Sequence, residues 1–155
     1  MVGILLIAHA PLAAALAAAA AHVYACAPER AGAQLRVFDV QPDSDTPANV
    51  AHARALAREL DTGSGVLVLT DTFGASPGNV ATQLAEPGRV AVIAGVNLPM
   101  LLRALCYRDG TLAEATEKAL AGGTQGVMQV ASTSVQHQGL RPTQGDDLAR
   151  VHDQQ

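Results

Sequence analysis

The sequence contains few of the residues on which several classes of protein depend. It has two cysteines, no tryptophan, 3% aromatic residues and a single lysine among ten basic residues. Nucleic-acid-binding domains are basic with clustered Lys and Arg, whereas this chain has a formal net charge of −4 and scattered arginines. So few aromatic side chains also provide no platform on which bases stack. We therefore expect no nucleic-acid partner.

The spacing of the two cysteines, Cys26 and Cys106, argues against zinc-binding and disulfide-stabilised proteins. They show neither CxxC nor Cys/His ligand spacing, so a zinc site and a disulfide framework are both unsupported. We expect reduced, buried thiols in a cytoplasmic protein, and no metal site.

Charged residues are absent from Met1 to Pro28. A signal peptide needs a basic segment before its apolar core, and a membrane-spanning helix needs ~20 predominantly apolar residues, which His9 and Pro11 interrupt here. The segment is better divided into a buried strand at Val2–Ala8, a turn, and an alanine-rich helix at Leu12–Ala27. We therefore expect no direct membrane insertion.

The same order of apolar run, polar turn and helix repeats along the chain. Further strands are expected at Leu35–Val40, Val66–Thr70 and Val90–Ala94, with a short edge strand at Gly126–Ala131. Helices are expected from an N-cap at Thr46 to Leu60, after the turn at Asp71–Gly78 to about Ala85, at Met100–Tyr107, and at Thr111–Ala121 with Thr111 and Glu114 at capping-box spacing.

Strands that alternate with helices predict an α/β fold over residues 1–131, followed by a polar, flexible tail over residues 132–155. The expected architecture is a doubly wound, mainly parallel four-stranded sheet with helices on both faces. In the strand order 2-1-3-4, the ends of the first and third strands lie side by side, where ligands bind. We therefore expect His9 and Asp71 to face each other.

The turn after the first strand holds His9 and no glycine-rich phosphate loop. Neither GxGxxG nor GxxxxGK[ST] occurs there, so no nucleotide cofactor is expected. Imidazole can act as a base, a metal ligand or a nucleophile, and the helix start behind it favours an anion. A histidine that merely fills the turn is the plainer alternative.

The segment after the third strand adds a carboxylate and small residues. Asp71 is placed to accept a hydrogen bond from one ring nitrogen of His9 and to leave the other free to attack. The backbone amides of Gly74, Ala75 and Ser76 are expected to form an anion-binding nest, to which the Ser76 hydroxyl adds a donor. An ordinary turn and helix start remain the alternative.

Parts of the sequence also match two other kinds of enzyme site. Gly74 to Gly78 spell GxSxG, the nucleophile elbow of α/β-hydrolases. However, Pro77 has no N–H where an oxyanion donor is needed, and the downstream histidines, His137 and His152, lie in the predicted tail. A metal chelatase that uses His9 as a ligand lacks a second strand-end histidine.

Three segments resemble one family. Ile7–His9, Asp71–Pro77 with Asn79, and Ile93–Met100 are similar to the enzyme IIA component, mannose family, of the phosphoenolpyruvate-dependent sugar phosphotransferase system of bacteria. The resemblance covers roughly Val2–Ala131. It implies a cytoplasmic phosphocarrier in sugar transport that accepts a phosphoryl group from the histidine phosphocarrier HPr. It passes this group to an enzyme IIB, expected on a separate chain.

The resemblance assigns roles to residues of this chain. His9 carries the phosphoryl group as a phosphohistidine, and Asp71 supports it. Gly74, Ala75 and Ser76 hold the phosphoryl oxygens, without metal or nucleotide, and the rim is expected to include Phe73, Asn97 and Met100.

The resemblance also implies a homodimer that exchanges an edge strand, for which Gly126–Ala131 is the candidate. A regulatory phosphoprotein without a role in transport, signalling by its phosphorylation state, is the alternative function. Two positions depart from the family pattern, because Ala10 and Ala75 stand where glycine is frequent.

Overall fold

Four parallel strands form the centre of the structure. The computed structural model describes residues 1–32 and 34–130. The strands lie in the predicted order β2-β1-β3-β4, and each neighbouring pair is parallel. Both faces of the sheet are covered, which is why β1, β3 and β4 read as apolar runs, whereas the edge strand β2 carries Arg36 and Asp39. Their bounds are β1 (Gly3–His9), β2 (Leu35–Val40), β3 (Val66–Thr70) and β4 (Val90–Ala94).

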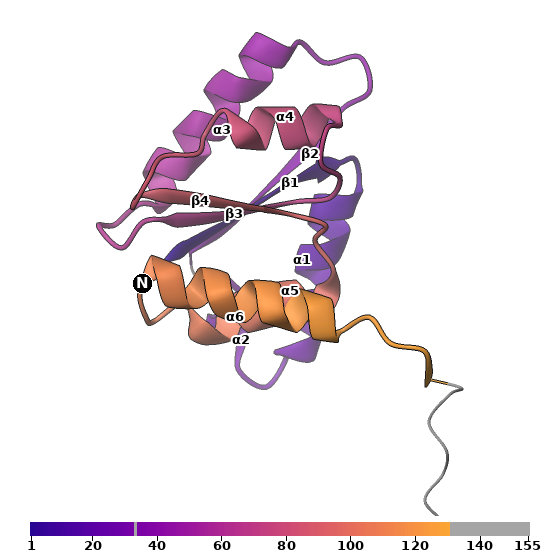
Figure 1. Cartoon of the computed structure of the whole chain (residues 1–155), viewed down its shortest axis with the longest axis vertical. Helices are drawn as coiled ribbons and strands as arrows, with labels where there is room; N and C mark the ends of the chain where they lie inside the picture. Colours follow the sequence, from indigo (N-terminus) through magenta and orange to yellow (C-terminus); the bar gives the residue numbers. More distant parts are fainter. Residues whose placement is uncertain (33, 131–155) are drawn as a thin grey trace, which may run out of the picture.

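Helices cover both faces, as the fold class requires (Figure 1). No helix within the described ranges is long and apolar enough to cross a membrane. On one face lie α1 (Leu12–Val23), α2 (Pro28–Gly32), α5 (Leu98–Tyr107) and α6 (Leu112–Gln125), and on the other lie α3 (Thr46–Leu60) and α4 (Ser76–Thr82).

Alternation along β1 separates the core into two layers. Ile4 and Leu6 pack with the layer under α1, α5 and α6, whereas Leu5 and Ile7 pack with the layer under α3 and α4. Successive side chains of a strand point to opposite faces, so both layers are filled from one short run. Every residue from Gly3 to Ala8 is therefore buried, and β1 delivers its last residue, His9, to the exposed carboxyl edge.

The helix caps follow simple sequence rules with one correction. The capping box of α6 is confirmed, because the Thr111 hydroxyl accepts from the Glu114 N–H and the Glu114 carboxylate accepts from the Thr111 N–H. The prediction of Thr46 as the N-cap of α3 is wrong. Asp45 takes that place, since its carboxylate accepts the Ala48 N–H at 2.9 Å.

The first helix ends earlier than predicted, at Val23 instead of Ala27. The Tyr24 hydroxyl donates to the carbonyl of Leu102 at 3.1 Å, which fastens the following turn to α5. Pro28 then opens a separate short helix, α2, where proline fits because the first helical N–H needs no partner. Two other helices end at different residues than predicted. α4 ends at Thr82 instead of about Ala85, and α6 continues to Gln125 instead of ending at Ala121.

Both cysteines are exposed, which corrects the expectation of buried thiols. Cys26 lies in the turn between α1 and α2, where little covers a side chain. Cys106 follows Leu105 on α5, and a helix that buries one residue turns the next away from the core. Both remain free thiols.

The expected strand at Gly126–Ala131 does not form within the single chain. Residues 126–130 follow α6 without strand structure, because no neighbouring strand edge of the same chain lies along them. Val127, Met128 and Val130 are 76%, 72% and 79% exposed. Ala131 and the predicted tail over residues 132–155 lie outside the described residues.

Candidate functional site

His9 and Asp71 meet at the carboxyl edge of the sheet. β1 and β3 are adjacent, with Ile7 opposite Thr70, so the residues that end these strands emerge side by side. This is the point where the chain order of the sheet reverses, between β1 and β3. Nδ1 of His9 lies 2.6 Å from Oδ2 of Asp71, and the expected contact is confirmed.

Asp71 is fixed by three short contacts. Its Oδ2 accepts the backbone N–H of His9 at 2.9 Å in addition to the contact with Nδ1, and its Oδ1 accepts the N–H of Thr72 at 2.7 Å. The side chain of Asp71 is 9% exposed, whereas that of His9 is 55% exposed. A held carboxylate therefore lies beneath an imidazole that solvent and partners can reach.

The environment of Asp71 keeps it ionised. Burial alone raises its pKa, but the hydrogen bonds from His9 and Thr72, together with the charge of His9, outweigh burial and lower the pKa below its usual value. An ionised carboxylate only accepts hydrogen bonds, so the contact assigns the proton of neutral His9 to Nδ1. The lone pair then resides on Nε2, at the other end of the exposed ring.

Two glycines after Asp71 have structural reasons: one adopts a backbone conformation that favours glycine, and the other lies too close to a neighbouring carbonyl for a side chain. Gly74 has φ of +83°, a left-handed conformation that favours glycine. A Cβ on Gly78 would lie 2.4 Å from the Thr72 carbonyl oxygen. Ala75 is extended, at φ −84° and ψ 170°, so its methyl group causes no backbone strain.

The predicted anion nest is only partly available. The Ala75 N–H donates to the Thr72 carbonyl at 3.4 Å, a long turn contact within the loop. Ser76 is the exposed first residue of α4, and the N–H of a first helical residue has no acceptor within its helix. Gly74 is also exposed. The structure thus leaves Ser76 and Gly74 more accessible than Ala75.

Ser76 does not have the surroundings of a hydrolase nucleophile. Its φ is negative, as in an ordinary helix start, whereas a nucleophile elbow is a strained turn. Within residues 1–32 and 34–130, no histidine forms a hydrogen bond with Ser76. His137 and His152 lie outside the described residues. Gly78, the last residue of the GxSxG pattern, is explained by its close approach to Thr72.

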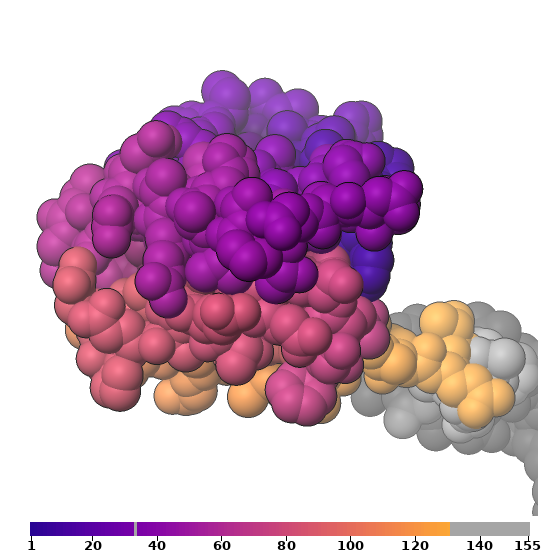
Figure 2. Space-filling model, turned by 90° about the horizontal axis from the view of Figure 1, so that it is seen from above, coloured from indigo at the N-terminus to yellow at the C-terminus, as the bar shows by residue number. Residues whose placement is uncertain are grey.

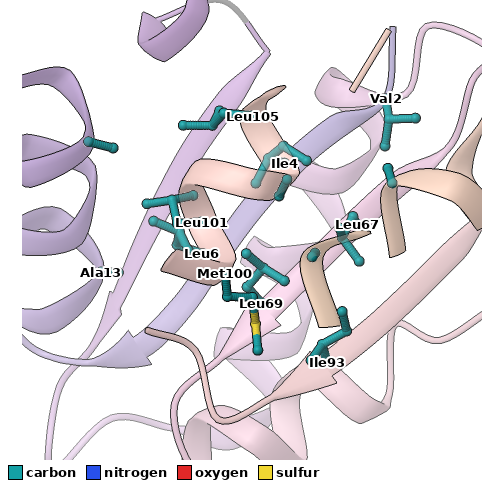
Figure 3. Packing of buried hydrophobic residues seen from close by; sticks show 14 of the residues in the cluster. Val2, Ile4, Leu6, Ala13, Leu67, Leu69, Ile93, Met100, Leu101 and Leu105 are labelled. Atoms are coloured by element: carbon teal, nitrogen blue, oxygen red, sulfur yellow. The ribbon is translucent and has the colours of Figure 1, made fainter. Parts of the chain in front are cut away.

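The three expected rim residues have different environments. Phe73 is 82% exposed next to the site. Asn97 caps α5 by accepting the Met100 N–H at 2.9 Å, and it donates to the Gly123 carbonyl at 3.0 Å. Met100 is 4% exposed and packs in the core near Leu69 and Ile93, so its placement at the rim is wrong (Figure 3).

Asp39 is a residue near the site that sequence analysis missed. Its Oδ1 accepts the N–H groups of Ala13 and Ala14, at 2.9 and 3.4 Å. These amides belong to the helix start that was expected to compensate an anion on His9, and a carboxylate from β2 occupies them instead. An acidic residue near the end of the second strand was the available signal.

No metal centre accompanies the site in the part of the chain that the structure describes, where no three His, Cys, Asp or Glu side chains are grouped to hold an ion.

Comparisons with known proteins agree with this fold. The family model described as "PTS system fructose IIA component" matches residues 3–121. The mannose-specific EIIAB component of the phosphotransferase system from Escherichia coli K12 is 34% identical over 102 residues, which are 64% of this chain and 32% of that protein. The chain thus spans about a third of the length of this curated relative.

Two solved structures share the architecture. The mannose/sorbose-specific IIA subunit from Enterococcus faecalis has a TM-score of 0.73 at 21% identity, covering 86% of this chain and 98% of that one. The phosphotransferase system component EIIA from Streptococcus agalactiae has a TM-score of 0.71 at 21% identity, covering 86% and 100%. Since the family model spans most of the sequence, the chain belongs to the mannose-type IIA family of the phosphotransferase system.

Proposed function

We propose that His9 accepts a phosphoryl group from phospho-HPr on Nε2 and passes it to an enzyme IIB in the cytoplasm, as a step of sugar transport. The contact between Nδ1 of His9 and Asp71 at 2.6 Å carries this proposal. It leaves the nucleophilic lone pair on Nε2 of an exposed ring, which a partner protein can approach. Family membership supports the same role.

The transfer needs positioning and electrostatics more than covalent work by the protein. The lone pair of Nε2 attacks phosphorus in line, and the bond from phosphorus to the donor nitrogen breaks with its electron pair left on the HPr imidazole. Positive charge develops on the ring of His9 as the new bond forms. The adjacent Asp71 carboxylate stabilises that charge and keeps the ring oriented.

The loop after Asp71 supplies the donors for the phosphoryl oxygens in this proposal. The N–H groups of Gly74 and Ser76 and the Ser76 hydroxyl are the donors, while Ala75 contributes less because its amide already has a turn contact. Phe73, which is 82% exposed, gives a partner an apolar contact beside the site. Neither a metal nor a nucleotide is required.

We also propose a homodimer that exchanges residues 126–131. Three of these side chains, Val127, Met128 and Val130, are exposed apolar groups that a partner copy would cover. β4 is an edge of the sheet. Its first residue, Val90, pairs with Glu86, and the rest of its outer side can accept a strand from the second copy.

The test measures phosphoryl transfer from phospho-HPr to the wild type, His9→Ala and Ser76→Ala. We expect no transfer to His9→Ala and slower transfer to Ser76→Ala, since only the first removes the nucleophile. An esterase activity that Ser76→Ala abolishes and His9→Ala leaves intact would contradict the proposal. A purely regulatory phosphoprotein would accept the group but fail to pass it to an enzyme IIB, so the second transfer separates the two functions.

A further inference from the structure

A second cavity lies at the amino-terminal edge of the sheet, away from His9. It occupies about 380 Å³ between the second half of α3 and the turn that joins α4 to β4. Val66 and Val90, the first residues of β3 and β4, line it, so it opens at the edge opposite the one where β1 ends. Its floor includes the buried side chains of Ala57, Val66 and Leu84. Figure 2 looks onto the face that α3 and α4 form above the sheet.

The wall of this cavity gathers positive charge in an acidic protein. Arg54, Arg58 and Arg89 line it, which is three of the ten basic residues of a chain whose net charge is −4. Arg54 and Arg58 are exposed and one helical turn apart on α3, where two like charges slightly destabilise a helix. Their placement on one side of α3 therefore favours a counter-charge beside them.

The carboxylates of the cavity do not supply that counter-charge. Oδ1 of Asp61 accepts the N–H groups of Gly63 and Gly65, and its Oδ2 binds Arg89 at 3.0 Å. Hydrogen bonds from Gly63 and Arg89 lower the pKa of Asp61, so these partners already compensate its charge. Glu86 likewise pairs with Arg89, at 3.4 Å. Both carboxylates are thus paired with Arg89.

The two arginines of α3 remain without an acidic partner. Across the described ranges, no carboxylate lies within 4.0 Å of the guanidinium of Arg54 or Arg58. Nη2 of Arg54 donates to the Gln83 carbonyl at 3.2 Å, which turns this guanidinium toward the cavity and leaves its other N–H groups available. Two available guanidinium groups above an apolar floor match a ligand with a charged head and a small organic body.

We propose that this cavity binds a small organic phosphate monoester. A phosphate monoester carries nearly two negative charges at neutral pH and offers three strong acceptor oxygens, which suits two guanidinium groups better than a single carboxylate does. The phosphoryl head lies between Arg54 and Arg58, and the organic body rests on Ala57, Val66 and Leu84. The volume is within the range of small-molecule sites. The site is separate from His9 and does not depend on the proposed phosphotransfer.

The test titrates the unphosphorylated full chain with glycerol 3-phosphate at constant ionic strength and follows its backbone amides by NMR. We expect saturable shifts for residues lining the cavity, none with glycerol, and unchanged binding in His9→Ala. The double substitution Arg54→Gln with Arg58→Gln should weaken binding about tenfold or more, because it removes the charge-assisted hydrogen bonds to the head group.

The matched control removes the same two charges elsewhere, with Arg30→Gln and Arg36→Gln on α2 and β2. It should bind as the wild type does. Equal weakening in both double variants, shifts that do not saturate, or shifts centred on Asp71 to Gly74 would overturn the proposal. Saturable binding of an acidic peptide without any of glycerol 3-phosphate would also overturn it, since the cavity would then belong to a protein interface.

Discussion

Asp71 sets the chemistry of His9 at the scale of single residues. It accepts both the backbone N–H and Nδ1 of His9, so one carboxylate fixes the position of the strand end and the tautomer of the ring. Its pKa is lowered, which means that the folded state binds a proton at this carboxyl less readily than the unfolded chain does. The contact between Asp71 and His9 therefore makes the free energy of unfolding depend on the ionisation of Asp71.

Asp71→Asn should lower the free energy of unfolding by about 2 kcal/mol at neutral pH, the scale of a hydrogen bond to a charged group. A carboxyl with a lowered pKa stabilises the fold fully above its unfolded value, about 3.9, and loses this contribution as the pH falls through the folded value. The difference between wild type and variant should therefore stay constant from about pH 7 to about pH 5, and shrink as the pH falls below about 4 toward the lowered folded value. Urea denaturation across this range measures it, with the exposed Asp43→Asn as control. A difference that also stays constant below about pH 4 would refute the linkage.

Thr70 presents the opposite case, a buried hydroxyl without a partner. Thr70 is 1% exposed, and its Oγ1 has no hydrogen-bond partner. Thr70→Val keeps the shape and removes the unsatisfied group, so we expect stabilisation by about 1 kcal/mol. Thr116→Val is the control, because its hydroxyl donates to the Leu112 carbonyl at 2.7 Å and its loss should not stabilise. Thermal unfolding decides, and destabilisation by Thr70→Val would show that the hydroxyl has a partner.

At the scale of elements, the first turn of α4 packs closely against the loop that follows Asp71, and Gly78 is the residue at this contact. Gly78→Ala would place a methyl group 2.4 Å from the Thr72 oxygen, so the first turn of α4 must shift away from the site. We expect a loss of about 2 kcal/mol of stability, in the range of overpacking a core, together with slower phosphorylation. Gly32→Ala, where no atom lies within 4 Å of the added Cβ, should change neither. Equal behaviour of the two variants in denaturation and transfer assays would disprove this role.

Several elements were predictable because they depend on local patterns. The strands follow from apolar runs, the cap of α6 from Thr111 and Glu114, and the meeting of His9 with Asp71 from the strand order. Other features depend on contacts between distant residues. Tyr24 ends α1 by bonding to α5, and Asp39 caps α1 from β2.

Predictions from local patterns were wrong for residues whose burial depends on which way a helix or turn faces them. Met100 follows the strand-end loop, as a rim residue does, but it lies in the first turn of α5, and the amphipathic face of that helix turns it into the core. Cys26 and Cys106 are apolar enough for the interior, yet a turn and an outward helix face place them in solvent. Such outcomes depend on helix rotation, which short sequence windows do not determine.

At the scale of the whole molecule, the sheet separates two sites. The carboxyl edge holds His9 and Asp71, whereas the amino edge holds the cavity lined by Arg54, Arg58 and Arg89. Residues 126–130 follow α6, and three of their side chains, Val127, Met128 and Val130, are exposed apolar groups on which the proposed dimer depends.

The proposed dimer predicts a change in mass. Val127→Asp with Met128→Asp should convert the dimer to a monomer, because charges cannot be buried at an apolar strand exchanged between copies. Leu120→Asp, at a 52% exposed position on α6, is the control and should leave the dimer intact. Sedimentation equilibrium distinguishes the states. A wild-type chain that sediments as a monomer would remove the basis of the exchange.

The intact mass of the protein after incubation with phosphoenolpyruvate, enzyme I and HPr tests the central claim most directly. We expect one added phosphoryl group on the wild type, labile in acid as a phosphohistidine is, and none on His9→Ala. With active upstream proteins, an unchanged wild-type mass, or an added phosphoryl group that persists in His9→Ala, would contradict the assignment of His9 as the phosphoryl acceptor.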